Sequence, residues 1–105
     1  MLKYKNRPTY MDGYRFASKA EAERYLILKM LLKSGQIQEF SLQPKFPLHA
    51  PDGTRIGHYI ADFLVVDKKG AKWAEDVKGV RTQLFNWKAK HFRAEYPHIE
   101  LRIIK

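Results

Sequence analysis

The sequence predicts an α/β (α+β) fold in which two helices and a mixed central sheet follow one another as helix, three strands, helix, strand. Residues 19–33 and about 82–96 have the apolar spacing of amphipathic helices. The remaining apolar runs are short and are bounded by Gly, Pro and Asp-Gly turn signals, which is typical of strands. At 105 residues the chain is large enough for one modest core, so we expect a single domain over 1–105.

Residues 1–16 form a basic and aromatic N-terminal arm. Asp12-Gly13 is a turn signal, and the residues on either side of it are compatible with a short hairpin. Two interpretations of the arm stay open, a plain surface segment and a segment that contacts DNA. In the second interpretation its basic residues are Lys3, Lys5, Arg7 and Arg15.

The first helix is predicted from its end signals and its apolar face. Ser18 and Glu21 have the spacing of a capping box, residues 19–33 contain no Gly or Pro, and Gly35 is a natural stop. The apolar residues cover a wide arc, so we expect the helix to pack against the sheet. They include Ala22, Tyr25, Leu26, Leu28 and Leu32.

Three strands are expected between the helices. The run 37–48 contains Pro44 and Pro47, which indicate an edge strand or one broken by a bend. The run 56–66 has the strongest strand pattern, and the turn that follows it leads into 71–77 as its hairpin partner.

The second helix is expected to begin after Thr82 and to end near Tyr96, before Pro97. Its core stripe is Phe85, Ala89, Phe92 and Tyr96, and its other faces carry Asn86, Lys88, Lys90, His91 and Arg93. The alternating run 99–104 then predicts a final strand.

Charged residues interrupt two runs that are otherwise apolar enough to be core strands. Asp62 lies in HYIADFLVV, and Asp76 and Lys78 lie two residues apart in KWAEDVKG, so this pair shares a face of its strand. If Asp62 faces the same side, two carboxylates and an ammonium converge. A hard divalent cation relieves the repulsion between such carboxylates, and a lysine beside it can steady a phosphate or the attacking water. The pattern therefore points to metal-dependent phosphodiester cleavage.

The composition narrows the class of protein. Twenty Lys and Arg against eleven Asp and Glu give a net charge of +9, which favours a polyanionic partner such as nucleic acid. The absence of cysteine excludes disulfides, zinc-thiolate sites and thiol nucleophiles. No signal peptide and no run of membrane-spanning length is recognisable, so a cytoplasmic protein without a membrane partner is expected.

Several blocks in order resemble the PD-(D/E)xK nuclease superfamily and, more narrowly, the small phage and prophage proteins of the DUF1064 family, which are described as Holliday-junction-resolvase-like. The blocks are FASKAEAERY (16–25), LQPKF (42–46), YIADF (59–63), EDVKG (75–79) and Arg81-Thr82. The resemblance implies a restriction-endonuclease-like core. The chain departs from the superfamily pattern at Ala61, where a proline usually precedes the first acid.

The resemblance also implies roles for particular residues. Asp62 and Asp76 stand at the two metal-binding acids, and Lys78 stands at the lysine that positions the water or stabilises the developing phosphorane charge. Glu21 matches a glutamate that related members place near the metal, and the carbonyl of Val77 would be a further ligand. The implied cofactor is Mg²⁺, with Mn²⁺ as the alternative.

The expected function is that of a metal-dependent endodeoxyribonuclease, selective for branched DNA if the resemblance extends to substrate. The setting would be a bacterial cell, with a phage origin implied, and symmetric junction cleavage would need a homodimer. The alternatives are a non-catalytic nucleic-acid-binding module with a nuclease-like fold and a nuclease acting on RNA, flaps or nicks. The residues expected to contact the DNA backbone are Lys3, Lys5, Arg7, Arg15, Arg81, Lys88, Lys90 and Arg93.

Some residues keep two interpretations. Glu21 is either a helix-capping residue or a site residue, and Lys78 is either catalytic or an ordinary surface lysine. Glu75 should face away from Asp76 and form a salt bridge, because neighbours in a strand point to opposite faces. We expect Glu23 to face solvent.

Overall fold

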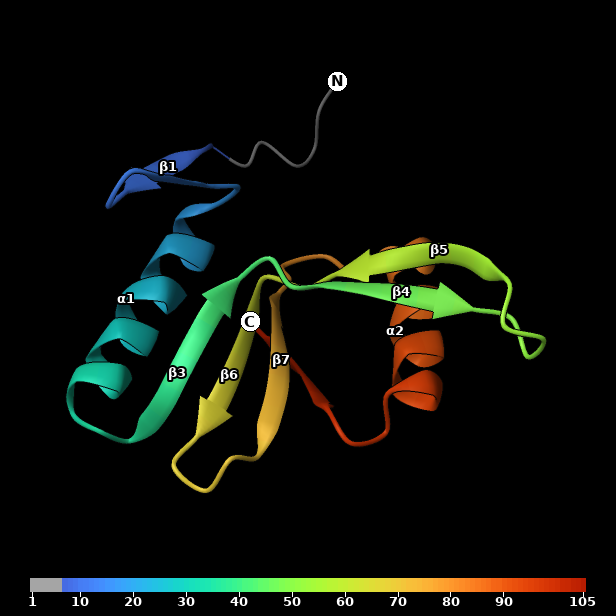
Figure 1. Ribbon diagram of the computed structural model, residues 1–105. Coiled ribbons are helices and arrows are strands. Elements are labelled where there is room, and N and C mark those ends of the chain that lie inside the picture. Colours follow the sequence, from blue (N-terminus) through green and yellow to red (C-terminus); the bar gives the residue numbers. More distant parts are fainter. Residues whose placement is uncertain (1–6) are drawn as a thin grey trace.

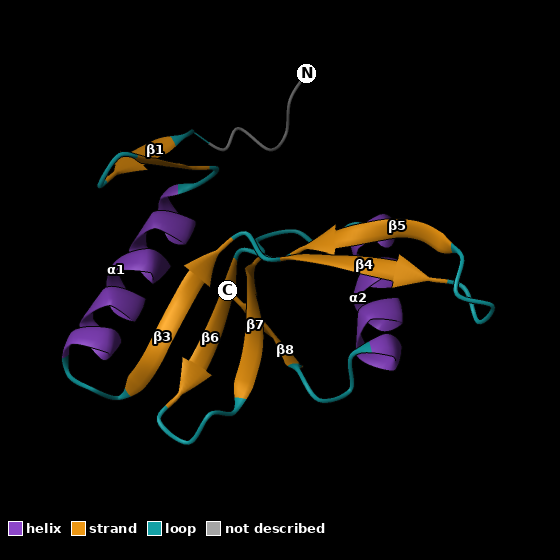
Figure 2. Cartoon of the chain, viewed as in Figure 1, coloured by secondary structure: helices purple, strands orange, loops and turns teal. Residues whose placement is uncertain are grey.

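The computed structural model describes residues 7–105, so the predicted contacts of Lys3 and Lys5 lie outside the described residues. It is a compact α+β fold with two helices and a mixed sheet (Figures 1 and 2). The elements in this range are β1 (Thr9–Met11), β2 (Tyr14–Phe16), α1 (Lys19–Lys33), β3 (Ile37–Leu42), β4 (Lys45–His49), β5 (Arg55–Ile60), β6 (Phe63–Asp67), β7 (Lys72–Val77), α2 (Gln83–Glu95) and β8 (Glu100–Ile104).

The central sheet has four strands in the spatial order β3-β6-β7-β8. The β3–β6 and β6–β7 pairs are antiparallel, whereas β8 pairs parallel to β7. A parallel pair needs a long crossover connection, and α2 supplies it between β7 and β8. The hairpin between β6 and β7 and the final strand were both predicted from the sequence and are confirmed.

The three strands predicted between the helices are five in the structure. Both long runs are divided: 37–48 forms β3 and β4, and 56–66 forms most of β5 and β6. β4 and β5 pair with each other as a separate two-stranded sheet. Figure 2 shows this sheet extending away from the central one toward α2. The prediction of a bend in 37–48 is confirmed, whereas the prediction of one continuous strand over 56–66 is wrong.

Both runs break at the same level because their backbones bond to each other there. The Gln43 N–H donates to the Asp62 carbonyl at 2.9 Å, and the Ala61 N–H donates to the Pro44 carbonyl at 3.2 Å. Gln43 adopts a positive φ of 50°, which turns the chain ahead of Pro44. As a consequence, Asp62 lies in the connection between β5 and β6, immediately before β6, and not within a strand.

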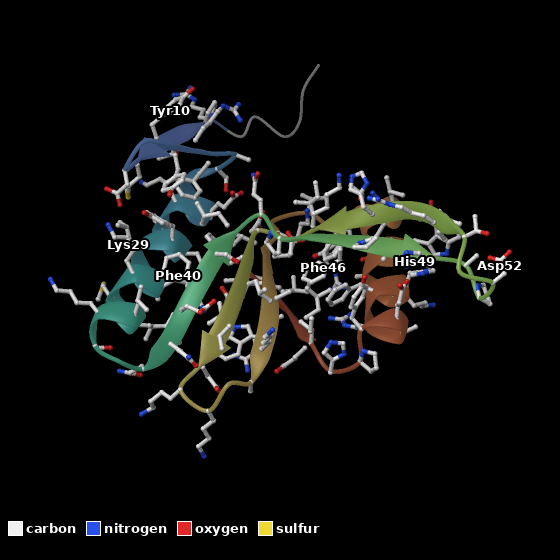
Figure 3. All side chains as sticks on the ribbon, viewed as in Figure 1. Tyr10, Lys29, Phe40, Phe46, His49 and Asp52 are labelled. Atoms are coloured by element: carbon white, nitrogen blue, oxygen red, sulfur yellow. The ribbon has the colours of Figure 1, made fainter. Side chains whose placement is uncertain are left out.

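Two apolar clusters lie on either side of the central sheet. Phe63 and Val65 of β6 face α1, whereas Ala74 of β7 and Leu101 of β8 belong to the cluster that contains α2. Figure 3 shows Phe40 on the α1 side and Phe46 on the α2 side. The two helices therefore cover opposite sides of the sheet, with α2 also packed against β4 and β5.

The ends of both helices agree with the predictions. The Ser18 hydroxyl accepts from the Glu21 N–H at 3.1 Å, and the Thr82 hydroxyl accepts from the Phe85 N–H at 3.1 Å. Gly35 follows α1 with φ of +78°, as a helix stop requires. Within residues 7–105, neither helix is long and apolar enough to cross a membrane.

The apolar faces agree only in part. The predicted stripe of α2 is confirmed, with Phe85, Ala89 and Phe92 buried and Tyr96 packed against them. In α1, however, Leu26 and Leu32 are exposed, so the wide apolar arc does not pack against the sheet throughout. The buried apolar residues of α1 are Ala22, Tyr25 and Leu28. The predicted hairpin around Asp12-Gly13 is confirmed as β1–β2.

Candidate active site

A cavity opens at the end of the central sheet where β6 begins and β7 ends. Since the two strands are antiparallel, the residue before β6 lies beside the last residues of β7. The Asp62 N–H donates to the Glu75 carbonyl at 2.9 Å, and the Val77 N–H donates to the Asp62 carboxylate at 2.7 Å. The cavity lies between the first turn of α1 and the segment that leads into α2. Its lining includes Glu21, Asp62, Val77 and Lys78.

Asp76 is buried beside this cavity, and both of its carboxylate oxygens have partners. The Tyr59 hydroxyl donates to Oδ2 at 2.5 Å, and Lys78 Nζ lies 3.4 Å from Oδ1. Burial first, and then the hydrogen bond to Asp76, raise the pKa of Tyr59, so this residue keeps its proton for donation. The sequence analysis missed Tyr59, although a core tyrosine close to two acids could have signalled a polar partner.

Lys78 connects the acidic cluster to α2. Besides pairing with Asp76, its Nζ lies 4.6 Å from the centre of the Phe85 ring, where the cation is attracted by the face of the aromatic ring. Its side chain is 31% exposed, compared with 3% for Asp76. Lys78 is therefore held in place by two partners while remaining accessible to a ligand from solvent. The expected convergence of Asp62, Asp76 and Lys78 is present.

The carboxylates of the site influence one another's protonation. Burial first, and then the charge of Asp76, raise the pKa of Asp62 to about 7, although the Val77 N–H lowers it in part. The pKa of Glu21 is also raised, mainly by burial and next by Asp76, with Lys78 acting in the opposite direction. The raised pKa values of Asp62 and Glu21 mean that burial and the neighbouring charge disfavour their ionised forms.

The two interpretations of Glu21 are compatible in the structure. Its backbone N–H is the group that the Ser18 hydroxyl caps, whereas its side chain is 7% exposed and lines the cavity with Asp62. Capping of the helix therefore places the carboxylate at the site instead of competing with it.

Glu75 is separated from the cluster by strand alternation. It is fully buried on the α1 side, where Arg24 donates to both of its carboxylate oxygens at 2.7 Å and the Trp73 indole donates at 2.8 Å. The predicted salt bridge is confirmed, and so is the exposure of Glu23. Of the two neighbouring acids in β7, only Asp76 belongs to the site.

The predicted DNA-contacting residues lie in three places. Arg15 lines a hollow next to the site, together with Glu21, Gln43 and Asp62, and Arg7 is exposed on the N-terminal arm. A groove on α2 is lined by Arg81, Asn86, Lys90 and Arg93. Lys88 lies apart from that groove and close to His58, whose pKa is lowered by burial first and then by Lys45, Lys88 and Arg55.

The oxygen atoms of Asp62, Asp76 and Glu21 are the kind that Mg²⁺ and Mn²⁺ take as ligands. In the described part of the chain, no group of three or more His, Cys, Asp or Glu side chains is arranged so that it could hold a metal ion. The arrangement instead offers a pair of interacting carboxylates, with Glu21 close enough to perturb them. Mg²⁺ is commonly held by one or two carboxylates, together with waters and substrate phosphates, so the donors present fit such an ion.

Comparison with known proteins gives one match. The model of the family described as "Protein of unknown function (DUF1064)" matches residues 1–105. Neither a curated protein nor a solved structure matches the chain. Since the match covers the whole sequence, the chain belongs to the DUF1064 family.

Proposed function

We propose that this protein is a metal-dependent endonuclease that hydrolyses phosphodiester bonds of DNA, with branched DNA as its preferred substrate. The observation that carries the proposal is the position of Asp62, Asp76 and Lys78 at one end of the central sheet. Asp62, Glu21 and the partly exposed Lys78 line one cavity there, and the buried Asp76 lies beside it, paired with Lys78 and interacting with Asp62. A buried acid such as Asp62, whose pKa is raised by burial and by a neighbouring carboxylate, is a common feature of functional sites.

The chain order of the central sheet supports the PD-(D/E)xK assignment. The elements that form and flank it follow in the order α1, β3, β6, β7, α2, β8. This is the superfamily order of helix, three strands, helix, strand, provided that β4–β5 is an insertion after the first of the three strands. In that reading Asp62 stands directly before β6 and Asp76 lies in β7, and these two strands are neighbours in the core.

Asp62 and Asp76 would hold the Mg²⁺ or Mn²⁺, with Glu21 and the Val77 carbonyl as further oxygen donors. When bound, such an ion lowers the pKa of a water and offsets charge on the phosphate. Lys78 would donate a hydrogen bond to the same phosphate or to the attacking water. Arg15 and the basic residues of α2 would hold neighbouring phosphates, which makes binding tolerant of sequence and sensitive to salt.

Cleavage of labelled DNA tests the proposal. The substrates would be a four-way junction, a linear duplex, a flap and a single strand, each with Mg²⁺ or with EDTA. Paired nicks in the junction that disappear in EDTA and in Asp76→Ala and Lys78→Ala would support a branch-selective nuclease. Cleavage of every substrate would keep the nuclease and reject the selectivity. A protein that binds these substrates but cuts none of them with Mg²⁺ or Mn²⁺ would contradict the proposal.

A second candidate function is a non-catalytic nucleic-acid-binding module. It is favoured by the pairing of both Asp76 oxygens within the protein, with Tyr59 and with Lys78, because a ligand would have to compete with those partners. The affinity of such a module for DNA should be indifferent to Mg²⁺ and to Asp76→Ala. Measuring that affinity by fluorescence anisotropy, with and without Mg²⁺, separates the two functions.

A further inference from the structure

The outer face of α2 carries a tryptophan that packing does not explain. Trp87 is 75% exposed and Leu84, one turn before it, is 60% exposed. Trp87 is two residues from both Phe85 and Ala89, which places it about 200° around the helix from each at about 100° per residue. It therefore points away from the core, whereas the other tryptophan, Trp73, donates its indole N–H to Glu75. An exposed tryptophan beside an apolar neighbour is a common feature of binding surfaces.

Trp87 lies in the first of two adjoining grooves, and most of the basic residues lie in the second. Gln83, Leu84, Asn86, Trp87 and Lys90 line the first groove, and Arg81, Asn86, Lys90 and Arg93 line the second. Because Asn86 and Lys90 belong to both, the grooves form one continuous surface, which we call the α2 surface.

The α2 surface carries no compensating acid from its own helix. Glu95 is the only acidic residue of α2. Its carboxylate accepts from the His49 N–H at 2.9 Å and also contacts the imidazoles of His49 and His91. The charges of Lys90, beside Trp87, and of Arg81 and Arg93, in the adjoining groove, are therefore not neutralised by an acid of α2.

The α2 surface begins beside the candidate active site. Val80 and Thr82 line the same cavity as Asp62 and Lys78, and Arg81 lies between them in the chain. The Arg81 guanidinium lies 5.9 Å from the centre of the Phe85 ring, the ring over which Lys78 is also placed. An extended ligand that leaves the active-site cavity past Arg81 would thus reach Lys90 and Trp87 along α2.

We infer that the α2 surface binds single-stranded nucleic acid, with an unpaired base stacked on Trp87 and backbone phosphates contacted by Arg81 and Lys90. Aromatic stacking inside a basic groove is the general means by which proteins hold unpaired strands. Charge complementarity argues for this occupant, because the basic residues match backbone phosphates and Trp87 offers a flat face to a base. The inference deepens the proposed function, because it adds that the substrate presents unpaired bases. It rests on the proposed function only in taking the ligand to be nucleic acid.

Fluorescence titration of the full chain in EDTA tests the inference without any cleavage. The probes are a short oligo(dT) strand and a blunt duplex of the same length, added to the wild type, Trp87→Ala, Trp87→Phe and Met30→Ala. Met30 is a matched control because it is 68% exposed on the other helix. We expect oligo(dT) to quench the tryptophan emission of the wild type and of Met30→Ala, but not that of Trp87→Phe.

Affinities measured by anisotropy of labelled DNA complete the test. Loss of the ring in Trp87→Ala should weaken oligo(dT) binding about tenfold and duplex binding much less, whereas Trp87→Phe should stay within a few-fold of the wild type. Equal affinity of Trp87→Ala and the wild type for oligo(dT) would overturn the inference. The inference would also be overturned if the wild type sedimented as a dimer and Trp87→Ala as a monomer, because the α2 surface would then be an interface between two copies of the chain. These binding measurements do not involve cleavage. A failure of the nuclease proposal would appear in the cleavage experiment and would leave their result unchanged.

Discussion

Glu75 and Asp76 are adjacent acids whose surroundings give them different tasks. Glu75 is neutralised by a two-point contact with Arg24 and by the Trp73 indole, on the α1 side of the sheet. Asp76 points to the other side, where Tyr59 and the partly exposed Lys78 are its partners. A buried acid satisfied by a fixed guanidinium is structural, whereas one paired with an accessible lysine can exchange partners when a ligand arrives.

Removing the partner of Glu75 should therefore act on stability. We expect Arg24→Met to lower the free energy of unfolding by about 3 kcal/mol, because it leaves a buried carboxylate without its cation. Urea denaturation measures the effect, and Glu23→Gln, an exposed change in the same helix, should shift stability by less than about 0.5 kcal/mol. A loss below about 1 kcal/mol in Arg24→Met would show that Glu75 does not depend on this pair.

Asp62 should make the protein less stable as the pH rises. Its folded-state pKa of about 7 lies above the ordinary value, so the folded state binds the proton more tightly than the unfolded state does. Stability is then lost between about pH 4 and about pH 7, as the folded carboxyl is forced to ionise. Asp62→Asn removes this titration and keeps an acceptor for the Val77 N–H. Its stability advantage over the wild type should therefore grow by about 4 kcal/mol across that range, which is about three pKa units at about 1.4 kcal/mol each.

Urea midpoints at about pH 4 and about pH 8, in EDTA, would measure this difference. Asp52→Asn is the control, because the Thr54 N–H lowers the pKa of that exposed carboxyl and its removal should bring no gain at high pH. An Asp62→Asn protein whose stability parallels the wild type at both pH values would show that Asp62 is not electrostatically strained.

At the scale of elements, the N-terminal ends of the two helices form part of the site. Ser18 fixes the first turn of α1 and with it the Glu21 carboxylate, and Thr82 fixes the start of α2 behind Lys78. The starts of both helices and the β6–β7 pair thus border the cavity, and Figure 1 shows that both helices begin at the same end of the central sheet.

Ser18→Ala should destabilise α1 by about 1 kcal/mol, since it leaves the Glu21 N–H without its acceptor. Thermal unfolding would measure the loss. Ser34→Ala, at the other end of α1, changes an exposed hydroxyl that bonds only to the Leu31 carbonyl and should cost less. If the two variants have equal stability, the cap of Ser18 does not contribute to the fold.

The helices could be predicted closely from the sequence because their end signals are local. Ser18 and Thr82 mark the starts by side-chain hydrogen bonds to residues three positions on, which the spacing alone reveals. The division of 56–66 could not be predicted, because nothing in that apolar run marks Ala61 as an end. The break follows from pairing with Gln43 and Pro44, which are close only in the folded chain.

The candidate site also combines residues that the sequence reveals with contacts that depend on the folded chain. Asp62, Asp76 and Lys78 were recognisable as charges in apolar runs, and alternation separated Glu75 from Asp76. The partnership of Tyr59 with Asp76 and the exposure of Trp87 depend on how the β4–β5 sheet and α2 pack, so the residue types alone did not reveal them.

At the scale of the whole molecule, a chain with a net charge of +9 pairs some of its acids within the fold and leaves basic residues on its surface. Glu75, Glu95 and Asp76 all have cationic or imidazole partners within the fold. The exposed basic residues of α2 remain for a polyanion.

Binding to DNA should therefore weaken steeply with salt, since each phosphate contact releases counterions. We expect Arg81→Ala and Lys90→Ala each to reduce the slope of log affinity against log salt concentration by about 1. Anisotropy titrations at several salt concentrations measure the slopes, with Met30→Ala as the control. Slopes identical to the wild type in both variants would place the DNA elsewhere on the molecule.

The central claim is that Asp62 and Asp76 form a site for a divalent cation. Mn²⁺ takes the same oxygen ligands as Mg²⁺, and its electron paramagnetic resonance signal reports the free ion directly. Titrating Mn²⁺ into the wild type should show saturable binding that is lost in Asp62→Asn and in Asp76→Asn and kept in Glu23→Gln. A wild type that binds no Mn²⁺, or equal binding in all four proteins, would contradict the claim.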